Sequence, residues 1–294
     1  MEILLCMFNF FSKLNKTRNR KYFFIMPLIF VSVFFCIFFF LPGCAKNNFS
    51  KNNSSGKKAA KNNLPVLKIA TEYGYPPFEY LASDGKTLIG FDIDMAEEIC
   101  RRIKMKPLFE DVQWTGIFSG LEAGRYDCVV SAVTITPERK EKFLITRPYV
   151  KNSQCFIVKA PMWFEESDEF VDSPEKLNGK KVAYQAETVS DVYVTNLLEN
   201  GAKFEVFEYD KLMDAINDLK FERVDVVVAE SVASNAIVKE SGYALQIDYI
   251  DEPDAEFGIL VNKKNPELFE KIESALDSMY DDGFMKSLEK KWLN

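Results

Sequence analysis

The types of side chain in this sequence limit the chemistry that the chain could perform. The chain of 294 residues contains no histidine. Ser-His and Cys-His nucleophile pairs, the HExxH zinc site and an imidazole general base are therefore excluded. Six cysteines are present, but no pair has the CxxC spacing of metal and redox motifs. We expect neither a metal ion nor a cofactor, and any catalysis would have to use carboxylates, lysine, tyrosine or thiols.

The cysteines divide between the N-terminal segment and the rest of the chain. The first group is Cys6, Cys36 and Cys44, and the second is Cys100, Cys128 and Cys155. The three cysteines of the second group cannot all pair with one another. Cys128 lies in an apolar run, which predicts a buried thiol.

The N-terminal segment has the three parts of a secretory signal. Several bases in residues 13–21 precede an apolar run at 22–41, which ends in Pro42-Gly43-Cys44. The pattern resembles a bacterial lipoprotein signal, in which the cysteine thiol takes a diacylglyceryl chain and the signal, here 1–43, is removed. The resemblance implies that Cys44 is lipidated. An uncleaved membrane-spanning helix is the alternative, and Met7 is a second candidate start; in either case the basic segment keeps the rest of the chain outside the cytoplasm.

The charge of the chain is unevenly distributed. Residues 44–63 are mostly Lys, Asn, Ser, Gly and Ala, which predicts a flexible tether. Residues 1–63 are basic and contain a single acid, Glu2, although the whole chain has a net charge of −7. Residues 64–294 are therefore strongly acidic, which argues against nucleic acid as a partner.

Strand and helix patterns alternate through residues 64–294. The predicted strands cover 67–71, 127–133, 181–184, 203–209, 224–229 and 257–261. The predicted helices cover 92–104, 117–123, 137–142, 188–198, 212–219, 232–239 and 266–292, the last with a break at Asp282-Gly283. Such alternation predicts an α/β fold with mainly parallel sheets. The blocks 127–130 and 225–228 are alike, Asp-Cys-Val-Val and Asp-Val-Val-Val, which indicates two similar lobes.

A series of short motifs runs through the same region in a specific order. It comprises Tyr75-Pro76-Pro77-Phe78-Glu79, Asp84-Gly85, Gly90-Phe91-Asp92-Ile93-Asp94, Trp114, Thr134-Ile135-Thr136-Pro137-Glu138-Arg139, Arg147-Pro148-Tyr149, Leu177-Asn178-Gly179-Lys180-Lys181-Val182, Arg223-Val224-Asp225 and Asn265-Pro266-Glu267-Leu268. In this order the motifs resemble the polar amino-acid substrate-binding proteins of ABC importers, which are extracellular solute-binding lipoproteins of family 3.

The resemblance implies a particular fold and division into domains. The expected fold is the two-lobed periplasmic-binding-protein-like fold of type II, in which two α/β lobes are joined by two crossing strands and close on a ligand. We expect lobe 1 to comprise 64–153 and 259–294, and lobe 2 with the hinge strands to comprise 154–258. The crossings are expected near 154–158 and 256–260.

The resemblance also assigns the groups that would bind a free amino acid, which carries one positive and one negative charge. Arg139 would hold the α-carboxylate with its planar guanidinium, and Glu230 would hold the α-ammonium. Thr134 and the backbone at Ser131 and Ala132 would complete these contacts. The backbone N–H groups of Thr188 and Val189 open a helix and would also suit the carboxylate.

The side chain of the ligand would lie between two aromatic residues. The resemblance places Tyr75 and Trp114 on either side of it, with Glu72 at the end of the first strand facing the pocket. Glu72 favours a cationic or amide side chain, so we expect arginine or lysine first and glutamine next. We expect a monomer that delivers the amino acid to the permease and ATPase of an ABC importer.

Two other functions are open to a chain of this type. Some proteins of this fold are dehydratases of the cyclohexadienyl type, but Arg139 and Glu230 together favour binding of an amino acid over that chemistry. A sensor or accessory module that binds an amino acid is the other alternative. The sequence does not identify the ligand, the permease or the presence of an outer membrane.

Overall fold

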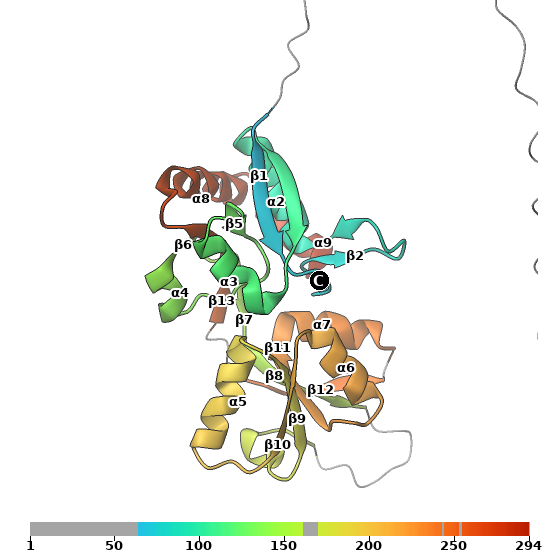
Figure 1. The fold of residues 1–294 in the computed structure, drawn as a ribbon. Coiled ribbons are helices and arrows are strands. Elements are labelled where there is room, and N and C mark those ends of the chain that lie inside the picture. Colours follow the sequence, from blue (N-terminus) through green and yellow to red (C-terminus); the bar gives the residue numbers. More distant parts are fainter. Residues whose placement is uncertain (1–63, 161–169, 243, 253–254, 294) are drawn as a thin grey trace, which may run out of the picture. The chain divides into compact units, whose positions relative to one another are not determined.

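The computed structural model describes residues 64–160, 170–242, 244–252 and 255–293 (Figure 1). The predicted signal, the predicted lipidation site at Cys44 and the predicted tether lie outside these residues. Within the described ranges, no helix is both long and apolar enough to cross a membrane. Cys100, Cys128 and Cys155 are free, buried thiols, which confirms the prediction for Cys128.

The first of two five-stranded sheets has the strand order β4-β1-β5-β14-β6. Its strands are β1 (Val66–Thr71), β4 (Lys106–Asp111), β5 (Cys128–Val129), β6 (Phe143–Ile145) and β14 (Leu260–Asn262). β1 runs parallel to β4 and β5, whereas β14 is antiparallel to β5 and β6. The accompanying helices are α2 (Phe91–Arg102), α3 (Trp114–Glu122), α4 (Pro137–Lys142), α8 (Pro266–Asp281) and α9 (Phe284–Trp292), and a hairpin is formed by β2 (Tyr80–Leu81) and β3 (Leu88–Ile89).

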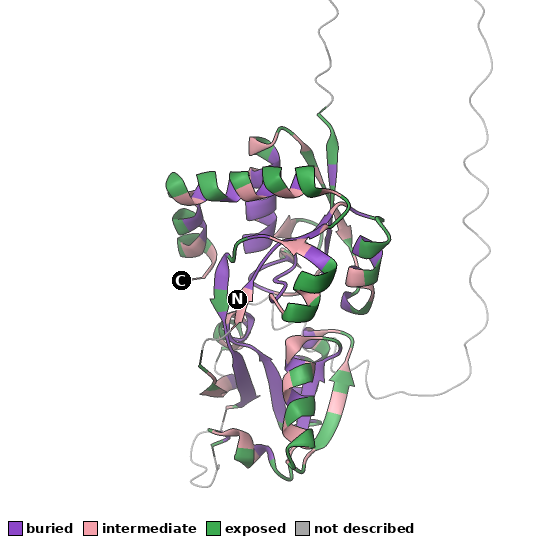
Figure 2. Ribbon diagram, turned by 90° about the vertical axis from the view of Figure 1, so that its left-hand side faces the viewer, coloured by how far each residue is buried: buried purple, intermediate pink, exposed green. Residues whose placement is uncertain are grey.

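The second sheet has the strand order β10-β9-β11-β8-β12. Its strands are β8 (Gln154–Lys159), β9 (Lys181–Gln185), β10 (Glu205–Tyr209), β11 (Val226–Glu230) and β12 (Leu245–Ile250). Its helices are α5 (Val189–Glu199), α6 (Leu212–Lys220), α7 (Ser231–Glu240) and the short η1 (Pro174–Leu177). Every residue of β11 is buried, because this strand lies at the centre of its sheet between β9 and β8. In Figure 2 the central strands β8, β9 and β11 are mostly coloured as buried, whereas the edge strand β10 and the outward faces of the helices are coloured as exposed or intermediate.

Two short strands that belong to neither five-stranded sheet form a separate antiparallel pair. They are β7 (Val150–Asn152) and β13 (Ala255–Phe257). β7 leads directly into β8 of the second sheet, and β13 is followed by β14 of the first sheet. The segment 154–158, where a crossing was expected, therefore belongs to the second sheet, and 256–260 divides between β13 and β14. The two-lobed α/β fold is confirmed, while the predicted lobe boundaries at 153/154 and 258/259 stay a prediction.

One predicted strand ends early in the structure, and another is divided. The strand expected at 127–133 is limited to Cys128–Val129, although residues 130–134 are also buried. Ala132 has a positive φ of 43°, and its backbone N–H donates to a carboxylate oxygen of Asp92 instead of to a strand. The strand expected at 257–261 divides at Gly258, where an added Cβ would lie 2.8 Å from the side chain of Ile145.

Candidate functional site

A small pocket forms where ends of strands from both sheets meet. It is lined by Glu72, Tyr75, Glu79, Trp114, Ser131, Ala132, Gln185, Thr188, Ser190, Leu212, Val228, Ala229 and Glu230. Seven of the residues predicted from the sequence are among them, and Thr134, Arg139 and Val189 are not. The pocket lies at the carboxyl ends of β1, β9 and β11, the edge at which α/β sheets usually bind ligands.

Glu230 is the last residue of β11 and accepts hydrogen bonds from three side chains. Its carboxylate accepts from Tyr75 Oη at 2.8 Å, from Asn152 Nδ2 at 3.0 Å and from the hydroxyl of Thr134. Tyr75 and Thr134 belong to the first-sheet part of the chain, so Glu230 joins the two lobes. Burial raises the pKa of Glu230, and its hydrogen bonds and the charge of Arg139 oppose that shift.

Arg139 lies on the other side of Thr134, in α4. Thr136 caps this helix, since its hydroxyl accepts from the Arg139 N–H at 3.2 Å, and Pro137 occupies the first turn. The guanidinium donates to the backbone carbonyl of Thr134 at 2.7 Å and lies 4.6 Å from the ring centre of Phe118. It forms no ion pair with any acid that the structure describes. Burial lowers the pKa of Arg139 to about 10, which leaves it charged at neutral pH.

Glu72 follows β1 and is 5% exposed. One carboxylate oxygen accepts from the backbone N–H of Trp114 at 3.1 Å, and the other accepts from Gln185 Nε2 at 2.7 Å. Burial raises its pKa, and these hydrogen bonds oppose that shift. Gln185, at the end of β9, was not predicted as a site residue. Its signal in the sequence was the same as for Glu72 and Glu230, a polar residue at the end of a buried strand.

Trp114 opens α3 and reaches across to the other lobe. Its indole N–H donates to the backbone carbonyl of Glu187 at 3.0 Å. Glu187 has a positive φ of 56°, the left-handed backbone conformation that glycine adopts most readily. Together with the bonds from Gln185 to Glu72 and from Tyr75 to Glu230, this contact links the two lobes across the pocket.

The two remaining predicted contributions lie at the start of α5. Thr188 is the N-cap of this helix: its hydroxyl accepts from the Asp191 N–H at 3.3 Å and donates to the Gln185 carbonyl at 2.7 Å. Val189 is the first residue of the helix. Thr188 therefore lines the pocket at a helix N-terminus, and Val189 lies beside it.

Two buried acids, Glu79 of the pocket lining and Asp92, were also not predicted as site residues. Glu79 accepts a hydrogen bond from the hydroxyl of Ser131 at 2.8 Å, and Asp92 accepts from the N–H of Ala132 at 2.7 Å. Glu79 and Asp92 are 1% and 0% exposed, respectively. They belong to the sequence motifs noted above, but nothing in those motifs distinguishes a buried acid from an exposed one.

The space enclosed by the pocket residues is small. Its volume is about 20 Å³, enough for about one water molecule and far less than an amino acid occupies. A ligand can enter only if the lobes separate or the side chains around Glu230 and Glu72 move. A fold with two lobes on a two-strand connection permits such an opening.

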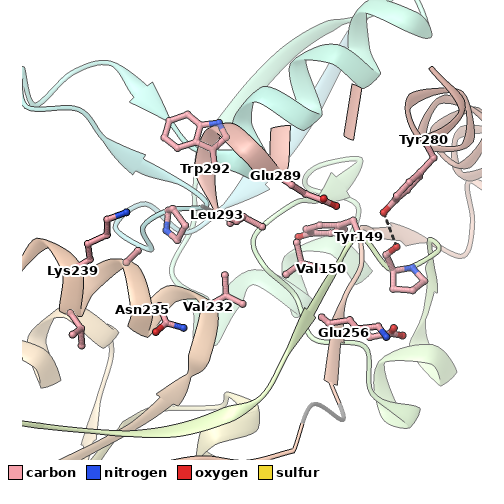
Figure 3. A pocket seen from close by; sticks show the side chains of 15 residues that line it. Tyr149, Val150, Val232, Asn235, Lys239, Glu256, Tyr280, Glu289, Trp292 and Leu293 are labelled. Carbon is pink, nitrogen blue, oxygen red and sulfur yellow. Dashed lines mark hydrogen bonds between the residues drawn. The ribbon is translucent and has the colours of Figure 1, made fainter. Parts of the chain in front are cut away.

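A second cavity, of about 930 Å³, lies beside β7 and β13 (Figure 3). Tyr149, Tyr280 and Trp292 line it on one side, and Val232, Asn235 and Lys239 of α7 on the other. None of the predicted ligand-binding residues lines it. Within the described ranges, no group of three or more Cys, Asp or Glu residues is arranged to hold a metal ion.

The chain matches one family model and many known proteins. Residues 67–294 match the model of the bacterial extracellular solute-binding proteins, family 3. The L-cystine-binding protein TcyJ of Escherichia coli is 27% identical over 227 residues, which cover 77% of this chain and 82% of TcyJ. An ancestral arginine-binding protein bound to arginine has a TM-score of 0.73 at 33% identity, covering 79% of this chain and 100% of that protein. Another structure, an ancestral arginine-binding protein bound to glutamine, has a TM-score of 0.70 at 34% identity, covering 77% and 97%.

Proposed function

The chain belongs to the bacterial extracellular solute-binding proteins of family 3, and from this premise we propose that it captures a free amino acid outside the cytoplasm for an ABC importer. The relatives similar to it bind cystine, arginine or glutamine. The family consists of binding proteins, which agrees with the expectation that the chain is not an enzyme. Delivery to a permease and its ATPase follows from the same premise.

The observation that carries the proposal is the placement of two opposite charges around Thr134. Arg139 bonds to the backbone carbonyl of Thr134, and Glu230 accepts from its hydroxyl. A free amino acid carries an anion and a cation on one carbon atom. Arg139 and Glu230, which are oppositely charged and both bond to Thr134, match that arrangement. The guanidinium can bind the α-carboxylate through two parallel N–H groups, and Glu230 can exchange its present donors for the α-ammonium.

We propose that the side chain of the ligand is cationic, with arginine or lysine preferred over glutamine. Glu72 supplies the argument, because it is buried beside Trp114 and Gln185. A guanidinium or ammonium would give Glu72 a charge-assisted hydrogen bond in place of the amide of Gln185, and could stack on Trp114 or Tyr75. A glutamate ligand would meet Glu72 as a like charge. An amide side chain could still donate to Glu72, which places glutamine second.

A thermal-shift screen tests the proposed ligand class. The protein without its first 63 residues would be heated with each of the twenty amino acids, ornithine, citrulline and cystine. A ligand at a thousand times its dissociation constant stabilises the folded state by about 4 kcal/mol, so arginine or lysine should give the largest increase in unfolding temperature. A larger shift with cystine or glutamate would refute the assigned specificity, and no shift with any amino acid would refute the function.

We also propose that the protein is a lipid-anchored monomer at the membrane. The support is the sequence before residue 64, where the apolar run 22–41 ends at Cys44. A diacylglyceryl chain on Cys44 and the tether 44–63 would hold the binding lobes near the importer.

A further inference from the structure

Two buried carboxyl groups at the pocket, Glu79 in its lining and Asp92, which bonds to the lining residue Ala132, each use only one of their oxygens for a hydrogen bond from a neighbouring group. Glu79 Oε1 accepts from Ser131 Oγ, and Asp92 Oδ2 accepts from the Ala132 N–H and from Tyr149 Oη at 2.9 Å. The other two oxygens, Glu79 Oε2 and Asp92 Oδ1, are buried and receive no N–H or O–H from any residue that the structure describes. A buried oxygen without a donor costs free energy that native structures rarely leave uncompensated.

A single proton between the two carboxyl groups would satisfy both oxygens. Glu79 and Asp92 bond to adjacent residues, Ser131 and Ala132, and each leaves one buried oxygen without a donor. Two carboxyl groups can form a hydrogen bond to each other only if one of them is protonated. The charged groups that act on Glu79 from neighbouring elements are Asp92, Glu72 and Glu230, all of which are acids. Tyr149 and the Ala132 N–H face Asp92. Two buried negative charges in these surroundings would repel each other, so one proton is retained.

The pKa directions agree with this geometry. Burial and the charge of Asp92 raise the pKa of Glu79 well above its usual range. Burial raises the pKa of Asp92 to about 7, against the opposing effect of its hydrogen bonds. Because the pair titrates as a unit, the proton belongs to both residues.

The two acids hold the segment that supplies much of the candidate site. Ser131, which donates to Glu79, also accepts from the backbone N–H of Glu72 at 3.0 Å. Ala132, which donates to Asp92, has the left-handed backbone conformation that costs most residues free energy. Two residues later Thr134 contacts both Arg139 and Glu230. The position of the segment 131–134 thus depends on the two carboxyl groups.

We propose that Glu79 and Asp92 share one proton and together position the segment 131–134 for amino-acid binding. The inference rests on the proposed function where it concerns affinity. The shared proton itself is independent of any ligand. Glu79 and Asp92 are positioning residues, because they act through Ser131 and Ala132.

Glu79→Gln tests the pair because glutamine reproduces protonated Glu79 without a titrating group. Its amide N–H can donate to Asp92 and its carbonyl can accept from Ser131. The variant should bind arginine within about threefold of the wild type. Glu79→Ala, which removes both bonds, should weaken binding about tenfold or more. Glu97→Gln, on the exposed side of α2, is the matched control and should behave as the wild type.

The pH dependence of unfolding provides the readout that a purely structural role would not change. A carboxyl whose pKa is raised by folding binds more proton in the folded than in the unfolded state. Its stabilising effect is complete below the unfolded pKa, near 4.5 for Glu79, and decreases as pH rises toward the folded pKa. Urea unfolding of the wild type between pH 5 and pH 8 should therefore show decreasing stability. In Glu79→Gln, the slope of the free energy of unfolding against pH should correspond to about one fewer proton bound by the folded state.

An unchanged slope in Glu79→Gln would overturn the shared proton. Loss of arginine binding as severe as in Glu79→Ala, in a folded Glu79→Gln protein, would overturn the positioning role. If Glu79→Ala fails to fold, Glu79→Gln alone decides. If the wild type binds no amino acid, the proposed function fails, while the comparison of slopes still decides whether the pair holds a proton.

Discussion

At the scale of single residues, the charges at the candidate site were partly recognisable in the sequence. Glu72 and Glu230 each stand at the end of an apolar strand, and the resemblance to the family assigned them to the site. Gln185 also stands at the end of a buried strand, but its amide carries no charge, and it was not predicted as a site residue. Glu79 and Asp92 could not be found in this way, because their burial depends on contacts with Ser131 and Ala132, which are distant in the sequence.

Arg139 is expected to be the main anchor of the ligand carboxylate. Removing one member of a desolvated charge pair costs roughly 3–5 kcal/mol, so Arg139→Ala should weaken arginine binding by two to three orders of magnitude or more. Arg139→Lys should recover only part of this loss, because an ammonium cannot form two parallel bonds to a carboxylate. Calorimetry would measure the affinities, with Lys140→Ala on the same helix as the control. Tight binding by a folded Arg139→Ala protein would contradict the assignment.

Glu72 is expected to distinguish cationic from amide side chains. Glu72→Gln keeps the shape but removes the charge, so arginine should lose about 1.5–3 kcal/mol of binding free energy, while glutamine should change much less. Because burial raises the pKa of Glu72, wild-type affinity for arginine should also fall as the pH is lowered through that pKa. Competition calorimetry with both ligands would test this, with exposed Glu122→Gln as the control. If the ranking of the two ligands does not change in Glu72→Gln, this residue does not determine specificity.

At the scale of elements, the sequence predicted best those helices and strands whose ends are determined by neighbouring residues. The helix predicted at 137–142 agrees with α4, because Thr136 and Pro137 specify its start. The strand predicted at 127–133 was too long, since the bond between Ala132 and Asp92 joins residues forty positions apart. The crossings expected near 154–158 and 256–260 stay a prediction. The short strands β7 and β13 pair with one another at the neighbouring positions 150–152 and 255–257.

The cap of α4 should affect both stability and the position of Arg139. Thr136→Ala removes the bond to the Arg139 N–H and should lower the free energy of unfolding by about 1 kcal/mol. Thr136→Ser retains the hydroxyl and should be close to the wild type. Urea unfolding would measure the difference, and arginine affinity should fall in the same order. Equal stability of the alanine and serine variants would show that the cap contributes nothing.

At the scale of the whole molecule, the sequence predicted the two-lobed fold because many short motifs occurred in one order over residues 67–294. It could not predict that the pocket encloses only about 20 Å³, since that depends on contacts between lobes such as Tyr75 with Glu230 and Trp114 with Glu187. These contacts join residues more than seventy positions apart in the chain, where sequence patterns carry no information on distance.

The proposed membrane anchor gives a prediction for the complete chain in cells. Cys44→Ser should abolish labelling by a fatty-acid probe, because this thiol is the proposed site of lipidation. Cys36→Ser changes a cysteine within the apolar run and should leave labelling intact. Gel fluorescence after metabolic labelling would compare the variants at equal expression. Labelling of Cys44→Ser at the level of the wild type would exclude this residue as the anchor.

The central claim is that the site binds a free amino acid through its α-carboxylate and α-ammonium. Titration calorimetry with L-arginine and with agmatine, its analogue without the α-carboxylate, tests this most directly. Both molecules carry the same guanidinium for Glu72, and only arginine has a carboxylate for Arg139. We predict tight binding of arginine and a loss of two or more orders of magnitude in affinity for agmatine. Equal affinities for the two, or no binding of any amino acid, would contradict the account.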